Sequence, residues 1–291
     1  MASKAKYINP FTDFGFKKLF GSEFNKELLI DFLNQVLGER ERIRDLTYLN
    51  TENQGKTEWD RKAVFDLYCE NERGEKFIIE LQNVSQLYFK DRSIFYATFP
   101  IQEQAPKGKD WDYYLKAVYT IGILNFSFPD KSSQERYLRE VQLIDNQTFE
   151  VFYDKLTFIY LEIPKFRKSE EELVTHFDKW MYVLKNLHRL QDKPAKLQEK
   201  VFDKLFIEAE IAKLTPEDMR TYEESLKTYR DNYSVLETAR SQGINEGIEK
   251  GIEIGASQRE TEIARRLKQK GVDLEVIAET TGLSKEQIEQ L

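Results

Sequence analysis

The sequence predicts an α/β protein, in which a mixed β-sheet is flanked by helices and is followed by an all-helical C-terminal region. Three observations predict this fold class. Short apolar runs rich in Val, Ile, Phe and Tyr are typical of strands that are buried on both faces. Amphipathic helical patterns lie before and between these runs, which favours a layered arrangement. From residue 169 onward the patterns are purely helical.

The N-terminal part alternates between predicted helices and strands. A helix is expected over 22–37, because Ser22 has the position of an N-cap and Gly38 that of a C-terminal cap. A second helix is expected within residues 86–104, ending near Pro100. The predicted strands cover residues 43–50, 63–69, 76–82, 116–128 and 157–163.

The C-terminal part is expected to consist of helices alone. Ser169 and Glu172 have the spacing of a capping box, which predicts a helix start. A second helix is predicted from Pro194 to Leu214, and a third begins after Thr215 with a proline in its first turn.

Glycine recurs every four residues near the end of the chain, at positions 243, 247, 251 and 255, with Ile at 244, 248, 252 and 254. This spacing places the glycines on one slowly drifting helix face. Because each glycine destabilises a helix by about 1 kcal/mol, close approach of a second helix is the expected reason for the repeat. We therefore predict a homo-oligomer that forms through 240–258, with a flexible linker as the alternative. Charges within the repeat, such as Lys250, exclude a membrane helix.

Three short helices are predicted at the C-terminal end. The first covers 260–270, Asp273 caps the second, and Ser284 with Gln287 forms a capping box for the third. The segment that begins at Ile277 resembles the turn of a helix-turn-helix motif. A helix that reads DNA should offer hydrogen-bond donors to base edges, and the acidic residues of the third helix favour protein–protein packing instead.

Composition narrows the class of protein. The 291 residues suggest one or two domains, and a net charge of −7 argues against a generic basic nucleic-acid-binding protein. A nuclease is not excluded, because a bound metal ion supplies positive charge at the phosphate. The single cysteine, Cys69, allows no intrachain disulfide, and neither a secretory signal nor a membrane span is apparent. A cytoplasmic protein that does not enter membranes is therefore expected.

Two carboxylates lie within the apolar runs of a predicted hairpin. Asp66 interrupts one strand and Glu80 lies near the end of the next, although an unpaired buried carboxylate is costly. A three-residue loop with Gly74 in the left-handed conformation would set the register of the hairpin. In this register Asp66 lies opposite Glu80, and Gln82 shares their face because side chains alternate along a strand.

Facing carboxylates repel each other unless a cation satisfies them, and Mg²⁺ (or Mn²⁺), which prefers oxygen ligands, suits this role. A water molecule on such an ion can attack a phosphodiester. Asp66 and Glu80 are therefore candidate metal ligands. The alternative is a salt bridge from the pair to Lys62 or Arg92.

An Asp on one strand followed by Glu80-Leu81-Gln82 on the next resembles the PD-(D/E)XK nuclease superfamily. Longer blocks in the same order are similar to the Rpn-type recombination-promoting nucleases and putative transposases of that superfamily. These blocks are Asp13-Phe14-Gly15-Phe16-Lys17-Lys18-Leu19-Phe20-Gly21, Phe32-Leu33-Asn34, Ile79-Glu80-Leu81-Gln82, Arg92-Ser93-Ile94-Phe95-Tyr96 and Ile163-Pro164-Lys165-Phe166. The resemblance extends over essentially the whole chain.

The resemblance implies a restriction-endonuclease-like sheet and a Mg²⁺-dependent DNA endonuclease associated with recombination, whose partner is DNA. Asp66 and Glu80 match the metal-binding positions, and both are expected to be catalytic. Gln82 stands at the position where the superfamily commonly has lysine, so it is a catalytic candidate that supplies no cation. The candidate accessory residues are Asp13, Lys62 and Arg92.

Three domains are expected on this basis. Residues 1–166 form the nuclease-like core, 167–238 a helical extension that packs on the core, and 239–291 the glycine-repeat helix and small helical tail. The alternative function is that of a catalytically weak or inactive nuclease-fold protein that binds DNA or acts as an adaptor.

Overall fold

The structure, a computed structural model, describes residues 5–38, 42–53, 63–105, 112–129 and 136–291. The chain divides into two compact units, one that ends at Arg230 and one from Asp231 to Leu291. The sheet lies in the larger unit. The functional roles expected for residues 1–166, 167–238 and 239–291 stay predictions.

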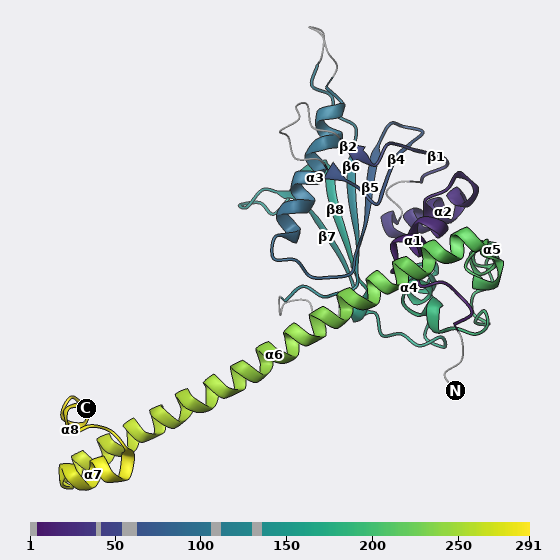
Figure 1. The fold of residues 1–291 in the computed structure, drawn as a ribbon. Coiled ribbons are helices and arrows are strands. Elements are labelled where there is room, and N and C mark those ends of the chain that lie inside the picture. Colours follow the sequence, from purple (N-terminus) through teal and green to yellow (C-terminus); the bar gives the residue numbers. More distant parts are fainter. Residues whose placement is uncertain (1–4, 39–41, 54–62, 106–111, 130–135) are drawn as a thin grey trace. The chain divides into compact units, whose positions relative to one another are not determined.

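Six strands form a mixed sheet in the order β1-β4-β5-β6-β8-β7 (Figure 1). They are β1 (Leu46–Tyr48), β4 (Leu67–Asn71), β5 (Lys76–Gln82), β6 (Val118–Leu124), β7 (Leu138–Ile144) and β8 (Val151–Glu162). The pairs β5–β6 and β6–β8 are parallel, whereas the pairs nearer the edges are antiparallel. A separate ladder joins β2 (Glu52–Asn53) to β3 (Ala63–Val64). With helices on either side, this sheet confirms the predicted fold class.

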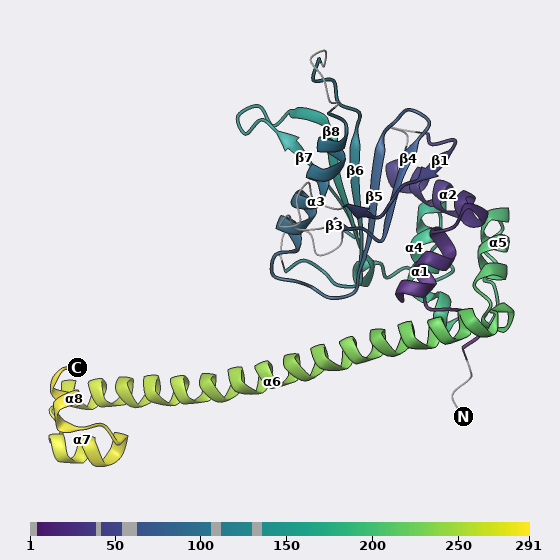
Figure 2. The ribbon, with the colours of Figure 1, turned by 45° about the horizontal axis from the view of Figure 1, so that its top comes forward.

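Different helices cover the two faces of the sheet (Figures 1 and 2). One face, which includes Phe77 and Ile79 of β5, packs with α1, α2, α4 and α5 in the main core. Helix α3 covers the other face, where its Phe89 and Ala97 pack with Tyr160 of β8. These helices are α1 (Asp13–Phe20), α2 (Lys26–Leu37), α3 (Phe89–Glu103), α4 (His176–Asn186) and α5 (Lys200–Glu208). Short 3₁₀ helices cover Glu23–Asn25, Ile163–Lys165, Leu187–Arg189 and Ile211–Lys213.

Helix α1 is absent from the elements expected from sequence, yet its start is well defined. Thr12 is the N-cap, because its Oγ1 accepts a hydrogen bond from Gly15 N at 3.0 Å. The Thr12 hydroxyl itself donates to Asn9 O at 2.8 Å. A Cβ atom on Gly15 would lie 2.1 Å from that same Asn9 oxygen, so glycine is required here. With 8 residues the helix is too short to give a clear periodic signal.

Several expected boundaries in the sheet region are wrong. The strand expected over 63–69 is interrupted at Phe65 and Asp66, which separate β3 from β4. The run 43–50 pairs only in its centre, as β1, and β8 begins well before residue 157. The half-exposed edge strand β7 has no buried apolar run, so the search for apolar runs misses it. Helix α3 continues past Pro100 to Glu103. Pro100 lies on the buried face of this helix.

Two of the expected helix starts in the C-terminal part are also wrong. Ser169 N does donate to Glu172 Oε2 at 2.7 Å, but these residues form a turn and no helix follows directly. Helix α4 begins later, with a complete capping box of Thr175 and Asp178. The helix expected from Pro194 begins only at Lys200, with α5. Pro194 itself lies in a segment of turns and irregular chain. Serine and threonine caps also occur in turns, so the capping pattern alone does not select the helix start.

Helix α6 (Pro216–Gln269) is continuous over 54 residues. Its start is as expected, since Thr215 Oγ1 accepts from Asp218 N at 3.1 Å. The separate helix expected over 260–270 is instead the end of α6. Within the larger unit α6 contributes Tyr222 to the main core, and the hydroxyl of Tyr222 accepts a hydrogen bond from Asn9 N at 3.0 Å.

The smaller unit has its own small core. The end of α6 packs with α7 (Leu274–Thr281) and α8 (Lys285–Glu289) around Ala264, Ile277 and Ile288. The side chains of Asp273 and Ser284 cap α7 and α8 as expected. None of the described helices is both long and apolar enough to cross a membrane.

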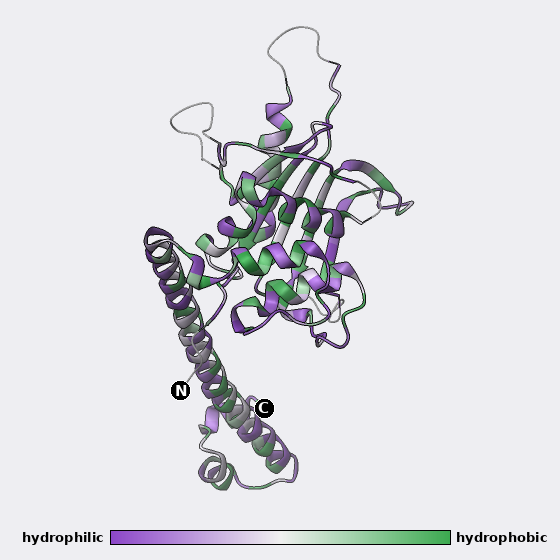
Figure 3. Cartoon of the chain, turned by 90° about the vertical axis from the view of Figure 1, so that its right-hand side faces the viewer, coloured by the Kyte–Doolittle hydropathy of each residue, from purple (hydrophilic) through white to green (hydrophobic). Residues whose placement is uncertain are grey.

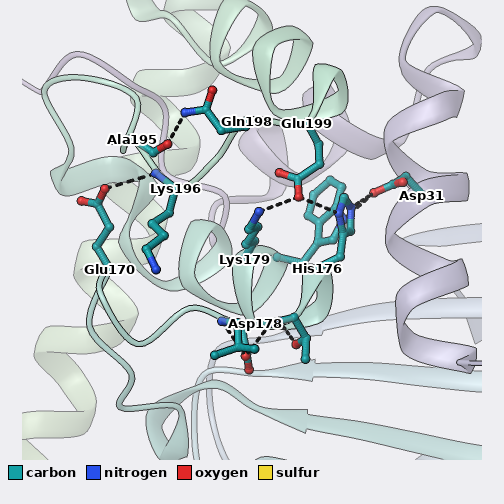
Figure 4. Close-up of polar contacts among 12 residues, drawn as sticks. Asp31, Glu170, His176, Asp178, Lys179, Ala195, Lys196, Gln198 and Glu199 are labelled. Atoms are coloured by element: carbon teal, nitrogen blue, oxygen red, sulfur yellow. Dashed lines mark hydrogen bonds and ion pairs between the residues drawn. The ribbon is translucent and has the colours of Figure 1, made fainter.

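His176 connects helices of the larger unit through its two ring nitrogens (Figure 4). Its Nε2 lies 2.6 Å from Asp31 Oδ2 of α2, and its Nδ1 lies 3.4 Å from Glu199 Oε1 at the start of α5. Trp180 Nε1 donates to the same Asp31 oxygen at 2.7 Å, and Lys179 Nζ lies 2.5 Å from Glu199 Oε1. The hydrogen bond with Asp31 raises the pKa of His176, although burial opposes the shift.

We expect His176 to stabilise the fold more at acid pH than at alkaline pH. A raised pKa in the folded chain means that its contribution is complete below about pH 6.5, the unfolded value, and is lost as the pH rises through the folded value. Chemical denaturation from about pH 6 to about pH 8 measures this. The free energy of unfolding should fall more steeply with pH in the wild type than in His176→Gln. The other histidine, His188, is present in both the wild type and the variant, so it does not affect the comparison. Burial lowers its pKa to about 4. Parallel curves would contradict the prediction.

Candidate functional site

The β4–β5 hairpin has the register expected from its loop. Leu67 pairs with Ile79 at the last position of the ladder. At the other end, Asn71 N donates to Glu75 O at 3.1 Å, and Gly74 has a φ of +78°. A residue with a side chain is strained in that left-handed conformation, so the glycine fixes the loop and, through it, the register.

Asp66 and Glu80 lie next to each other just beyond the last pair of this ladder. Asp66 N lies 3.4 Å from Glu80 Oε1 and donates to it. Asp66 Oδ2 accepts a hydrogen bond of 2.6 Å from Leu81 N. The hairpin thus brings together the two carboxylates that the sequence singles out, and each is tied to the main chain of the other strand.

The backbone is irregular at the point where Asp66 leaves the ladder. Phe65 packs with Tyr68 and Ile78 in the cluster beneath α3. In a regular strand, Phe65 and Tyr68 would point to opposite faces. The irregularity explains why the strand expected over 63–69 is split, and why the Asp66 carboxylate binds the main chain of β5.

Both carboxylates have raised pKa values. Burial, reinforced by the negative charge of Asp66, raises the pKa of Glu80 to about 8. Burial also raises the pKa of Asp66, while the hydrogen bond from Leu81 N opposes the rise. Neighbouring buried carboxylates share a proton because both cannot ionise cheaply in the absence of a cation. The pair therefore has the electrostatic character of a cation site.

Gln82 is held by contacts at both ends of its amide. Its Oε1 accepts from Arg92 Nη2 at 2.5 Å, and its Nε2 donates to Val84 O at 2.9 Å. Arg92 Nη1 also donates to Gln86 Oε1 at 2.6 Å. Among the described residues these amides are the hydrogen-bond partners found for the guanidinium, and Arg92 forms no ion pair there with either Asp66 or Glu80. The positive charge of Arg92 is thus fixed beside Gln82.

Two charged residues of α1 act on Asp66 as well. Lys17 Nζ lies 2.8 Å from Asp13 Oδ1 in an exposed ion pair. Besides burial, which is the main cause, the charge of Asp13 raises the pKa of Asp66 and the charge of Lys17 lowers it. Asp13 therefore acts electrostatically on Asp66, which is compatible with an accessory role. Lys62 lies outside the described residues.

The donor set fits a small, hard cation. Asp66 and Glu80 offer carboxylate oxygens, and no group of three or more His, Cys, Asp and Glu side chains in the described part of the chain is arranged to hold a metal. Transition-metal sites are commonly built from such groups. Mg²⁺ instead keeps several waters and needs only one or two carboxylates besides substrate phosphates. Two adjacent carboxylates with raised pKa values satisfy that requirement.

Some residues around Glu80 cannot be found from local motifs. Thr120 and Tyr160 line a small cavity together with Glu80, although they come from β6 and β8. Tyr96 of α3 lines the same cavity, and after burial the charge of Glu80 contributes to raising its pKa. Of these residues, the sequence motifs include only Tyr96, in the block Arg92-Ser93-Ile94-Phe95-Tyr96. No motif indicates Thr120 or Tyr160.

Comparison with known proteins places this geometry in a family. A family model described as PD-(D/E)XK nuclease family transposase matches residues 10–239. The chain belongs to the PD-(D/E)XK nuclease family. The match confirms the resemblance drawn from the sequence blocks, and it ends before the glycine repeat. The searches of curated proteins and of solved structures gave no match.

Proposed function

We propose that this PD-(D/E)XK family member is a metal-dependent DNA endonuclease that hydrolyses phosphodiester bonds during recombination or transposition in the cytoplasm. The observation that most supports this function is the adjacency of two partly buried carboxylates, Asp66 and Glu80, at the end of the hairpin. Membership of a nuclease family described as transposases supports the same class of reaction.

In this proposal Asp66 and Glu80 hold one Mg²⁺ or Mn²⁺ ion, which when bound activates a water molecule and offsets charge on the phosphate. Leu81 N–H fixes the orientation of the Asp66 carboxylate. Arg92, held in place by Gln82, supplies the fixed positive charge that a neutral amide lacks and binds a phosphate oxygen. Asp13 adjusts the charge of the site from α1.

The second candidate is a nuclease-fold protein that binds DNA or acts as an adaptor with little or no catalysis. Two observations favour it. The Gln82 amide is engaged at both ends by Arg92 and Val84, which leaves it less able to orient a water molecule. The net charge of −7 also disfavours a large phosphate-binding surface.

Nicking of supercoiled plasmid by the purified full-length protein tests between these functions. We expect relaxed and then linear DNA in the presence of Mg²⁺ or Mn²⁺, and no cleavage after chelation of the metal. Binding of DNA without nicking in either metal would reject the endonuclease and support the second candidate.

We expect metal affinity to increase with pH. Since the pKa of Glu80 is about 8 without metal, a cation that binds below this pH must displace a proton. The apparent affinity should therefore fall by about tenfold for each pH unit below the pKa and level off above it. Titration calorimetry with Mn²⁺ in buffers of different ionisation enthalpy measures both the affinity and the number of protons released. An affinity that is independent of pH between about 6 and 8 would contradict the assignment of Glu80 as a ligand.

A further inference from the structure

A small, partly enclosed space lies behind Glu80, between α3 and the sheet. Its volume is about 10 Å³, which is close to the space that a single water molecule needs. Its lining includes Glu80 of β5, Thr120 and Gly122 of β6, and Tyr160 of β8. The cavity surface is mainly apolar, but Glu80, a proposed metal ligand, and Thr120 are among the residues that line it.

Among the residues that line the cavity, Thr120 has a buried hydroxyl without a hydrogen-bond partner in the described part of the chain. The side chain of Thr120 is 2% exposed. In the parallel register Gly122 is the partner of Glu80, so Thr120 lies two positions earlier on the same face. A buried hydroxyl without a partner is costly, and most such groups in folded proteins bind ordered water.

The remaining walls keep the space open but do not satisfy Thr120. A Cβ atom on Gly122 would lie 3.0 Å from Tyr160 Cδ1, so the glycine leaves room for both the ring and the cavity. The Ser93 hydroxyl donates to Phe89 O at 3.1 Å, which uses its hydrogen. Arg92 donates to Gln82 and Gln86, as described above.

We propose that this cavity binds one water molecule, which hydrogen-bonds to Thr120 Oγ1 and to the Glu80 carboxylate. Thr120 is thereby a positioning residue that acts on Glu80 through the water. An apolar cavity of this size stays dry, whereas polar partners on two sides hold a water. Such a bridge limits rotation of the carboxylate, and partners of metal ligands commonly affect metal affinity in this way. The role in positioning rests on the proposed function, whereas the presence of the water does not.

The test combines a crystal structure of the full-length protein, at a resolution that reveals ordered waters, with Mn²⁺ calorimetry on variants. Thr120→Val removes the hydroxyl at nearly constant volume, and Thr120→Ser retains it. The matched control is Thr157→Val in β8, since Thr157 is equally buried but its hydroxyl accepts from Gln142 Nε2 at 3.1 Å. We expect density for the water, an affinity about tenfold weaker in Thr120→Val, and affinities near wild type in Thr120→Ser and Thr157→Val.

Other outcomes overturn the proposal. A dry cavity rejects the water. If the cavity were dry, Thr120→Val would also be more stable than the wild type and would bind Mn²⁺ equally well. An equal loss of affinity in Thr157→Val would assign the effect to packing, and a loss in Thr120→Ser as large as that in Thr120→Val would exclude the hydroxyl. If Thr120→Val does not fold, the proposal is tested by the density for the water in the crystal structure and by the Mn²⁺ affinity of Thr120→Ser. A wild type that binds no Mn²⁺ and nicks no DNA rejects the proposed function, and the crystal structure then still decides on the water.

Discussion

Asp66→Asn and Glu80→Gln are each expected to reduce Mg²⁺-dependent DNA cleavage by about a thousandfold or more. Metal catalysis contributes several kcal/mol to stabilisation of the transition state, and about 1.4 kcal/mol corresponds to a tenfold change in rate. Both substitutions keep the size of the side chain. In Asp66→Asn the amide oxygen still accepts the Leu81 N–H, which Asp66→Ala would leave without its acceptor. The loss should therefore reflect the metal site and not unfolding.

The single-turnover rate of plasmid nicking measures this effect, with thermal unfolding as a check on the fold. Asp45→Asn is a suitable control, because Asp45 is an exposed carboxylate that pairs with Lys26 on α2. Its main chain contacts Glu72 in the hairpin loop, at the opposite end of the hairpin from Asp66 and Glu80. It should cleave at the wild-type rate, and Gln82→Ala should be slowed less than the two ligand variants. Cleavage by Asp66→Asn at the wild-type rate would assign the activity to a contaminant or to another site.

The hairpin and its acidic pair could be predicted from sequence because every determinant is local. The loop closed by Asn71 and Glu75 is three residues long, and Gly74 permits the left-handed conformation that this loop requires. Once the loop is fixed, alternation along the strands determines which side chains are neighbours. Strand β5 has the bounds that its apolar run predicts, because both its neighbours and its helices bury it.

Features that depend on distant segments could not be predicted. The irregularity at Phe65 arises because its ring fits beneath α3, and nothing in the local pattern encodes that contact. Helix α1 is fixed by Asn9 and Gly15, where one carbonyl excludes any side chain. Thr120 becomes a neighbour of Glu80 only through the parallel pairing of β5 and β6. Long-range pairing of this kind leaves no periodic signal in either strand.

The glycine repeat of α6 also remains without a partner in the described part of the chain. Ile244, Ile248 and Ile252 are 51%, 57% and 68% exposed, and Figure 3 shows apolar positions recurring along α6. A Cβ atom on any of the four glycines of the repeat would meet nothing within 4 Å. Glycine is thus not required by contacts within this unit, although four of them destabilise the helix by about 4 kcal/mol in total. We propose that a second copy of the chain approaches this face closely.

The double variant Gly247→Ala, Gly251→Ala in the full-length chain distinguishes close packing from a linker. Each added methyl group should stabilise the isolated helix by about 1 kcal/mol. If a second helix packs against the glycines, the same methyl groups obstruct it, so helicity rises while self-association weakens. Light scattering at about tens of micromolar protein should show a dimer for the wild type and a shift towards monomer for the variant. Deletion of residues 240–291 should leave a folded core of lower oligomeric order. A monomeric wild type at that concentration, or a variant whose dimer is as stable as that of the wild type, would contradict packing through the glycines.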